Sequence, residues 1–429
     1  MVCSGIFLAA CLLKQNEGRH MIMNRRRLLK STAIGTAAAV ASPFIIRDLH
    51  AQDIIKIAGI HDTSGGLDIY GKQMVATLDL AVNEINAAGG VLGKKIALTN
   101  YDPQSNIQLY TQYATEAATK EKVAVVHGGI TSASREAIRP LLKRFNTLYF
   151  YNTLYEGGVC DRNIFCTGST PAQTVEKLVP YVQKKWGKKV YTIAADYNYG
   201  QITAKWVKKY AQDNGGEVVQ TDFFPLDVTD FGPTIKKIQA AKPDLVMSAL
   251  VGAAHISFYR QWAAAGMNKQ IPLASTTFGN EIVITSPEEH NGYIVAFAYL
   301  EGIDTPANKK FVEIVHGKYG IPHMTELATM TYHGMYLWAD AVKKAGSVDR
   351  MKVIEALEAN ASFDGPAGKT TIDPQTHHTV LDVYIGEAKD KKFAVLEKFS
   401  QQKPSDTSAV CDLKKNPNEN KQYVIDVKT

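Results

Sequence analysis

Residues 54–87 read IIKIAGIHDTSGGLDIYGKQMVATLDLAVNEINA. The first seven form an apolar run that is typical of a buried strand, and a turn follows over residues 61–66. From Gln73 to Ala87 apolar residues recur at helical spacing, and Gly89-Gly90 come where a helix should end. The stretch therefore predicts a strand, a turn and a helix, which is the repeating unit of α/β folds.

This unit recurs along the chain. Further strands are expected over 95–100, 123–127, 148–151, 164–167, 189–194, 218–224, 244–250, 271–274 and 293–299. Helices are expected over 105–120, 134–145, 200–215, 231–241, 254–266, 306–319, 328–345 and 349–359. Two series of alternating strands and helices predict an α/β protein with two doubly wound, parallel-sheet lobes. The polar residues 401–429 are expected to lie over the surface.

Residues 1–51 have the order of an export signal. Asn24 to Lys30 is basic and matches the twin-arginine pattern, an Ala-rich run follows over 31–46, and cleavage is expected near Ala51. A membrane anchor is the alternative, but the run is shorter than the ~20 residues of a span and contains Pro43. We expect a periplasmic protein with its leader removed.

The first 20 residues do not fit that signal. Leu8-Ala9-Ala10-Cys11 looks like a lipoprotein box, but no Lys or Arg precedes it. A start site assigned too early is the simpler interpretation, with Met21 or Met23 as the true start.

The leader also carries most of the excess positive charge. The chain has 48 Lys+Arg and 42 Asp+Glu, of which residues 1–51 hold seven and two, so 41 and 40 remain. This balance gives no argument for nucleic-acid binding. The remaining 378 residues are enough for two domains.

Three cysteines follow the leader. Cys166 lies in an expected strand and reads as a buried thiol. Cys160 lies in a Gly-rich loop and Cys411 in the polar tail, so a bridge between these two would attach the tail to the body. The sequence leaves the pairing open.

Catalytic and metal-binding motifs are not evident. Gly368-Lys369-Thr370 lacks the earlier glycine of a phosphate loop, and Gly129 to Ala133 only resembles a nucleophile elbow. His377-His378 do not have the i, i+4 spacing of a helical zinc site. We therefore expect no enzyme activity, no metal and no cofactor.

The segments that follow the strands carry a recognisable series of motifs. They include Asn86 to Gly93, Thr131 to Arg135, Tyr151 to Gly157, Asp196 to Tyr199, Pro225-Leu226, Thr229 to Phe231, Ala241 to Asp244 and His377-His378. In this order, from about residue 54 to about 400, the chain resembles the branched-chain amino-acid, amide and urea receptors of bacterial uptake systems. The resemblance implies a type I periplasmic-binding fold, with a cleft between two lobes and three crossovers near 168–173, 298–304 and 370–376.

The resemblance also implies domain bounds and partners. Lobe 1 would comprise residues 52–170 and 301–372, lobe 2 residues 171–300 and 373–405, and a tail residues 406–429. The protein would be a monomer that captures a small polar organic solute, either urea, a short-chain amide or an aliphatic amino acid. It would deliver this solute to the membrane permease of an ATP-driven (ABC) importer.

The resemblance assigns ligand contacts residue by residue. Ser132 and Thr131 would hold a ligand carbonyl or carboxylate at a helix N-terminus. Thr153 would bond the ligand from the next loop, and Gly252 would contact it from the other lobe. The aromatic walls would be Tyr151, Tyr197 and Tyr199, whereas packing is favoured for Tyr155.

Two carboxylates have alternative interpretations. Glu281 would accept ligand N–H groups or be a solvated loop charge. Asp62 would do the same or serve as a turn or N-cap residue.

The chain departs from the urea and amide receptors at two places. Gly200-Gln201 stand where these receptors usually have Pro-Arg, and Val251 to His255 replaces a frequent Asn-Gly-Asp. The loss of a charged and a polar contact predicts a pocket for a larger or less polar solute than urea.

Two other classes of function remain as alternatives. An exported α/β hydrolase could use Ser132 with His127 or His255 in the same cleft. A ligand-sensing regulatory receptor is less consistent with the sequence, because no signalling segment follows residue 400.

Overall fold

The computed structural model describes residues 54–425 and residue 427. The predictions for the leader, the start site and the cleavage near Ala51 lie outside these residues. Within the described part, no helix has both the length and the apolar character that crossing a membrane requires.

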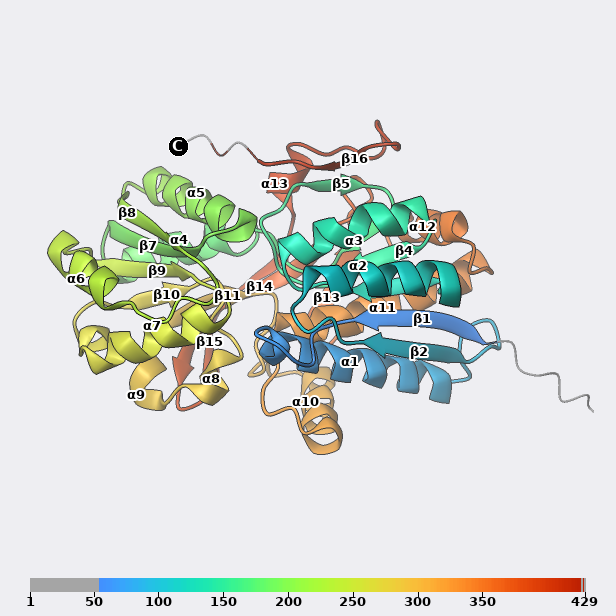
Figure 1. The fold of residues 1–429 in the computed structure, drawn as a ribbon, viewed down its shortest axis with the longest axis horizontal. Coiled ribbons are helices and arrows are strands. Elements are labelled where there is room, and N and C mark those ends of the chain that lie inside the picture. The colour runs from blue at the N-terminus through green and yellow to red at the C-terminus, as the bar shows by residue number, and fades with distance from the viewer. Residues whose placement is uncertain (1–53, 426, 428–429) are drawn as a thin grey trace, which may run out of the picture. The chain divides into compact units, whose positions relative to one another are not determined.

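The first lobe contains a sheet in which every strand pair is parallel. Its order is β2 (Ile96–Tyr101), β1 (Ile55–Ile60), β3 (Val125–Gly128), β4 (Leu148–Tyr151) and β6 (Ile164–Cys166). Helix α1 (Asp68–Ala87) packs with α11 (Glu326–Ala345) on one face, and α2 (Ile107–Glu116) packs with α3 (Ser132–Arg144) on the other (Figure 1). Helices on both faces make this lobe doubly wound.

The second lobe contains most of a nine-stranded sheet, whose end strands at residues 362–372 lie beside α11 of the first lobe (Figure 1). Its order is β8 (Glu217–Phe224), β7 (Lys189–Ala195), β9 (Leu245–Ala249), β10 (Leu273–Ser275), β11 (Ile294–Phe297), β14 (Thr379–Lys389), β13 (Gly368–Ile372) and β12 (Ser362–Gly365), and β15 (Lys392–Gln402) also pairs with β14. Helices α4 (Val175–Trp186) and α5 (Asn198–Asp213) lie on one side, and α6 (Gly232–Ala241) and α7 (Ala253–Ala264) on the other (Figure 1). The two-lobed α/β architecture expected from the sequence is confirmed.

The second sheet is mixed rather than purely parallel. Strands β7 to β11 pair in parallel, but β14 runs antiparallel to β11, and the pairs β12–β13, β13–β14 and β14–β15 are antiparallel too. A two-residue turn joins β14 to β15, with Asp390 and Lys391 in the left-handed region. Such hairpins need no crossover helix, so the strand–helix alternation used for prediction does not reveal them.

Smaller elements complete the fold. They are the π-helical turn η1 (Ala117–Glu121), the 3₁₀ turn η2 (Met267–Lys269), α8 (Glu281–Ile284), α9 (Pro287–His290), α10 (Pro306–Tyr319), α12 (Arg350–Glu358), α13 (Ser405–Ser408), and the strands β5 (Val159–Asp161) and β16 (Asn420–Gln422). The helix expected over 105–120 therefore ends as a π-helical turn, and the helix expected from Gln73 begins at Asp68.

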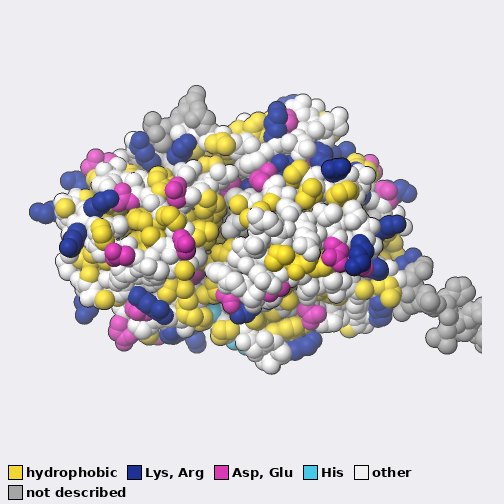
Figure 2. Space-filling view, in the orientation of Figure 1, with side chains coloured by type: hydrophobic (Ala, Val, Ile, Leu, Met, Phe, Trp, Pro, Cys, Tyr) yellow, Lys and Arg dark blue, Asp and Glu magenta, His cyan; other side chains and the backbone are white. Residues whose placement is uncertain are grey.

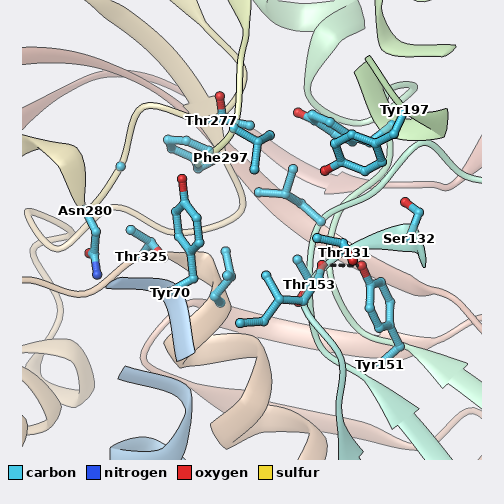
Figure 3. A pocket seen from close by; sticks show the side chains of 16 residues that line it. Tyr70, Thr131, Ser132, Tyr151, Thr153, Tyr197, Thr277, Asn280, Phe297 and Thr325 are labelled. Carbon is cyan, nitrogen blue, oxygen red and sulfur yellow. Dashed lines mark hydrogen bonds between the residues drawn. The ribbon is translucent and has the colours of Figure 1, made fainter. Parts of the chain in front are cut away.

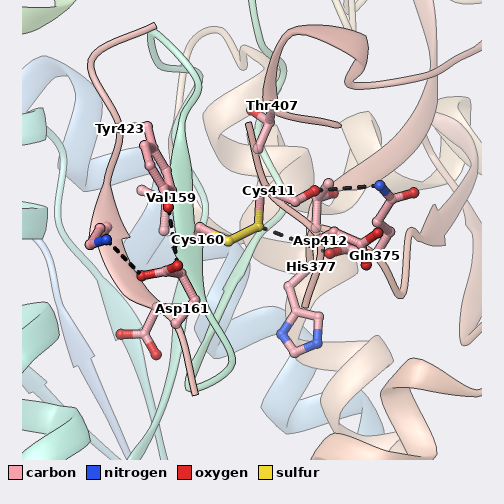
Figure 4. Close-up of a disulfide and its surroundings, with 12 residues drawn as sticks. Val159, Cys160, Asp161, Gln375, His377, Thr407, Cys411, Asp412 and Tyr423 are labelled. Carbon is pink, nitrogen blue, oxygen red and sulfur yellow. Dashed lines mark hydrogen bonds and ion pairs between the residues drawn. A yellow bond between two sulfur atoms is a disulfide. The ribbon is translucent and has the colours of Figure 1, made fainter. Parts of the chain in front are cut away.

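The C-terminal segment is tied to the first lobe. A disulfide joins Cys160 to Cys411, whose Cα atoms lie 5.4 Å apart, and β16 pairs with β5 beside it (Figure 4). This is the pairing that the sequence favoured, and Cys166 is a buried free thiol. Asp406 and Cys411 are buried, so the tail does more than cover the surface.

Charged side chains of both signs are interspersed on the face shown in Figure 2. This agrees with the nearly balanced charge of residues 52–429 and gives no sign of a basic patch on that face.

Candidate functional site

A cavity lies beyond the carboxyl ends of parallel strands from both sheets (Figure 3). It is lined by Tyr70, Ile130, Thr131, Ser132, Tyr151, Thr153, Leu154, Tyr197, Tyr199, Val251, Thr277, Gly279, Asn280, Phe297, Thr325 and Leu327. The cavity has a volume of about 50 Å³, measured as the space that the centre of a water molecule can occupy. One water needs roughly 10–15 Å³ on this measure, so the cavity has room for several. The cavity therefore suits a small molecule.

The sheet topology explains why the site forms here. In the first sheet β2 and β3 flank β1, and in the second β8 and β9 flank β7, so chain order reverses at β1 and at β7. Ligands of open α/β sheets bind at such reversals, beyond the carboxyl ends of the strands. Residues 129–132 follow β3, Tyr197 follows β7 and Val251 follows β9, so both reversals contribute to the cavity.

One end of the cavity is formed by the N-terminus of α3. Thr131 is the N-cap residue, and its hydroxyl accepts a hydrogen bond from the Ser134 N–H at 3.1 Å. The first N–H groups of a helix have no partner within the helix and carry a partial positive charge. Ser132, the first helical residue, lines the cavity at this end.

The hydroxyl of Ser132 is held from behind by a buried ion pair. It donates to Glu156 Oε2 at 2.5 Å, and Arg135 Nη2 lies 3.1 Å from Glu156 Oε1. Both charged side chains are fully buried. Burial alone would lower the pKa of Arg135, but the neighbouring Glu156 raises it well above its usual value. The guanidinium is thus a permanent cation beneath this wall of the site.

The walls next to Ser132 are fixed by hydrogen bonds to the backbone. Tyr151 donates its hydroxyl to the Ile130 carbonyl at 2.7 Å, and Thr153 donates to the Gly129 carbonyl at 3.2 Å. From the second lobe, Tyr199 shares a 2.9 Å hydrogen bond with Thr276, and its ring centroid lies 6.1 Å from that of Tyr197. Burial raises the pKa of Tyr197 well above its usual value, so its phenol stays neutral.

Tyr70 lines the opposite end and was not singled out from the sequence, because it lies between the predicted turn over 61–66 and the predicted start of the helix at Gln73. Its hydroxyl donates to Glu281 Oε1 at 2.6 Å. Burial would raise the pKa of Glu281, but His255, whose Nδ1 lies 3.3 Å away, and hydrogen bonds from Tyr70 and the Gly279 N–H lower it. Glu281 is therefore a buried carboxylate that orients Tyr70.

Three of the predicted ligand contacts lie outside the cavity lining. Glu281 stands behind Tyr70, and it is neither solvated nor among the lining residues. Asp62 is buried and accepts hydrogen bonds from the Ser105 N–H and the Tyr110 hydroxyl, both at 2.7 Å. These partners are 43 and 48 positions away in the chain and the N-cap of α1 is Leu67, so Asp62 is not the cap of this helix. Gly252 is the N-cap of α7 and lines a separate groove with Ile69 and Lys72. The other six predicted contacts are brought together.

The geometry around Ser132 differs from that of a hydrolase. The side-chain partner of Ser132 is Glu156, whereas His127 pairs with Asn152 and His255 with Glu281 and Tyr259. Among the residues that the structure describes, no cluster of His, Cys, Asp and Glu is suited to a metal ion.

Residues 55–408 match the sequence model of a protein family, the periplasmic binding protein domain. The chain belongs to this family. The match covers both sheets and every residue of the cavity lining. It identifies a type I periplasmic binding protein, a solute-binding receptor of ABC transporters, and the family implies export to the periplasm.

Relatives of this binding protein support the same assignment. Leu/Ile/Val-binding protein homolog 6 of Brucella melitensis is 25% identical over 345 residues, which cover 78% of this chain and 87% of the relative. An ABC-transporter solute-binding protein of R. palustris, solved with 4-hydroxybenzoate, has a TM-score of 0.73 and 26% identity, covering 82% of this chain and 98% of the other. One from Rhodopseudomonas palustris BisB5, solved with 3,4-dihydroxybenzoic acid, has a TM-score of 0.75, 25% identity and the same coverage.

Proposed function

We propose that this receptor captures a small organic acid with an aromatic body, of the hydroxybenzoate class, and delivers it to the permease of an ABC importer. The observation that carries the proposal is the cavity lining: none of its sixteen residues has a charged side chain. A carboxylate would lie at the N-terminus of α3, where helix N–H groups favour an anion.

The rest of the lining fits an apolar ring with a polar substituent. Four tyrosines and Phe297 provide aromatic surface, with Ile130, Leu154, Val251 and Leu327 between them. At the end opposite Ser132, Tyr70, Thr277, Asn280 and Thr325 offer hydroxyl and amide groups (Figure 3). A ring hydroxyl could form hydrogen bonds there while the carboxylate is held at Ser132. The relatives solved with 4-hydroxybenzoate and 3,4-dihydroxybenzoic acid support this choice.

The solutes suggested by sequence resemblance are less well matched by the lining. An α-amino acid needs a partner for its ammonium group, and the two carboxylates next to the lining are already paired. Glu281 accepts from Tyr70 and pairs with His255, and Glu156 accepts from Ser132 and pairs with Arg135. Urea and short amides would leave the aromatic walls largely without contacts. The lining therefore favours an aromatic acid over both.

Capture would proceed by closure of the two lobes. Ser132 and Thr153 come from the first lobe, and Tyr197, Tyr199 and Thr277 from the second. A ligand that bonds both sets stabilises the closed arrangement relative to an open one, and the permease would recognise that closed form. We infer that the receptor acts as a monomer whose leader is removed near Ala51.

A thermal-shift panel on the purified protein, unfolded and refolded to remove carried ligand, tests the proposal. The solutes are 4-hydroxybenzoate, benzoate, leucine, valine, urea and acetamide, with 4-hydroxybenzamide as a matched control that has the ring and hydroxyl but no carboxylate. A ligand at a hundred times its Kd should add about 2.7 kcal/mol to the free energy of unfolding. We expect the largest shift in Tm with 4-hydroxybenzoate and a smaller one with benzoate, which lacks the hydroxyl.

The controls decide between the classes. An equal shift with 4-hydroxybenzamide would show that the N-terminus of α3 does not hold a carboxylate. A shift with urea and acetamide alone would contradict the proposal in favour of an amide receptor, and a shift with leucine and valine alone would favour an amino-acid receptor.

A further inference from the structure

The ligand wall at Ser132 is connected by hydrogen bonds to the C-terminal segment of the chain. Arg135 Nη2, which bonds Glu156, also donates to Gln422 Oε1 at 2.8 Å. Gln422 Nε2 in turn donates to the carbonyl of Gly157 at 2.9 Å, the residue after Glu156. An unbroken series of contacts thus runs from Gln422 through Arg135 and Glu156 to Ser132.

Arg135 reaches the cavity by a second route. Its guanidinium carbon lies 4.9 Å from the ring centroid of Tyr151 and 4.3 Å from that of Tyr155. Tyr151 lines the cavity, so the position of one buried cation bears on two neighbouring parts of the wall. Packed interiors transmit such displacements because they contain little free volume.

We call residues 411–423 the C-terminal strap. Its strand β16 is only three residues long, and it pairs Gln422 with Val159 and Lys421 with Cys160. An isolated two-stranded pair of this length is not stable by itself in water. The Cys160–Cys411 disulfide fixes the start of the strap next to this pair and so limits how far β16 can move away (Figure 4).

We propose that the C-terminal strap is part of the ligand-binding machinery: Gln422 positions Arg135 and Glu156, these hold Ser132 and Tyr151 in the binding geometry, and the Cys160–Cys411 disulfide keeps Gln422 in place. Ligand affinity then depends on the redox state of that disulfide. The inference rests on the proposed ligand site, but not on which solute occupies it.

The chain offers a matched control two residues away. Asn420 lies on the same strand, and its side-chain oxygen also accepts from an arginine of α3, namely Arg139. Arg139 pairs with Glu136 and Asp161 rather than with Glu156. Asn420→Ala therefore removes a similar strap contact, and its arginine is linked to the series only through Glu136, which also pairs with Arg135 at 3.0 Å.

The first experiment measures hydrogen–deuterium exchange of the free protein over residues 130–136 and 151–157, together with the Kd for 4-hydroxybenzoate by calorimetry. Gln422→Ala should speed exchange in both segments and weaken binding about three- to tenfold, because it removes the hydrogen bonds to Arg135 and to the Gly157 carbonyl that hold this wall in place. Asn420→Ala should leave the exchange rates of these segments and the Kd within twofold of the wild-type values. Gln422→Glu keeps the acceptor for Arg135 but loses the donor to the Gly157 carbonyl, so its affinity should lie between those of Gln422→Ala and the wild type.

The second experiment is a double-mutant cycle with the disulfide. The Cys160→Ser/Cys411→Ser variant should weaken binding as Gln422→Ala does, and adding Gln422→Ala should have little further effect, because both changes release the same contact. Additive losses would overturn the role of the disulfide.

The outcomes separate this inference from the proposed function. Equal exchange and affinity in the Gln422 and Asn420 variants would overturn the strap's role in positioning Ser132. If the wild type does not bind 4-hydroxybenzoate, the proposed function fails, and the exchange data alone decide the role of the strap.

Discussion

Ser132 combines two roles that its substitution can separate. Its hydroxyl satisfies the buried Glu156, and the same residue opens α3 at the end of the cavity. Ser132→Ala should weaken binding of the proposed acid about tenfold, because the hydroxyl that ties the first turn of α3 to Glu156 is lost and the N–H groups that face the carboxylate are held less firmly. It should cost about 1–3 kcal/mol in stability through the unpaired Glu156 oxygen, without unfolding the protein. Calorimetry and urea unfolding measure the two effects.

Ser134→Ala is the control for this prediction. Ser134 belongs to the same helical turn, and its hydroxyl accepts from the Ile130 N–H at 3.2 Å and donates to the Thr131 carbonyl at 2.9 Å, but it does not line the cavity. Its loss should lower stability and change affinity less than Ser132→Ala does. Unchanged affinity in Ser132→Ala would remove the central residue of the site.

Single residues also mark the limits of prediction from sequence. Six of the predicted contacts line the cavity because their place after a strand fixes where they lie. The role of Glu281 depends on Tyr70, which is 211 positions away in the chain, and that of Asp62 on Tyr110. Local patterns carry no information about such partners, so neither the burial of these carboxylates nor the site role of Tyr70 could be inferred.

At the scale of elements, the position of helix α5 against strand β7 depends on a close backbone contact that only glycine permits. Gly200, in the first turn of α5, would bring an added Cβ within 2.0 Å of the Ala195 carbonyl oxygen at the end of β7. Gly200→Ala should therefore move α5, destabilise the protein by about 1–3 kcal/mol and weaken ligand binding through Tyr197 and Tyr199. Thermal unfolding and calorimetry test this, and wild-type stability with unchanged affinity would contradict it.

A gain in stability is expected where a glycine in a helix has free space around it. Gly317 is exposed in α10, and an added Cβ would meet nothing within 4 Å. Gly317→Ala should raise the free energy of unfolding by about 0.5–1 kcal/mol, because alanine loses less backbone freedom in a helix. It should leave ligand affinity unchanged, which makes it a control for Gly200→Ala.

The elements that could be predicted are those with periodic patterns. Most strands and helices up to residue 299 were located to within a few residues, because their apolar residues recur at the period of the element. The helix α4 and the short elements β5, α8 and α9 were missed. Strands β12 to β15 were missed for two reasons. The connections between them are hairpins that contain no helix, and β15 is largely exposed and so lacks an apolar pattern. The bounds predicted for the lobes at residues 170, 300 and 372 remain predictions.

At the scale of the whole molecule, buried histidines should make stability depend on pH. His61, His127, His333 and His378 are buried, and burial lowers their pKa values from 6.5 to about 3, 4, 3 and 4. Below pH 6.5 the unfolded chain binds protons at these sites and the folded protein does not, so the free energy of unfolding decreases as the pH is lowered. Between pH 7 and 5 each histidine should account for a loss of about 2 kcal/mol.

Asp406 acts in the opposite direction. Burial raises its pKa from 3.8 to about 6, so the folded protein binds a proton that the unfolded chain does not take up until lower pH, and its contribution to stability rises as pH falls from 7 to 5. Burial also raises the pKa values of Asp62 and Glu326, which act in the same direction as Asp406. We expect the four histidines to outweigh these carboxyls, so urea unfolding should show a lower midpoint at pH 5 than at pH 7. Asp406→Asn removes one opposing group and should steepen this dependence. A midpoint that stays constant or rises toward pH 5 would show that the histidines are protonated in the folded protein, or that acidic groups control its stability.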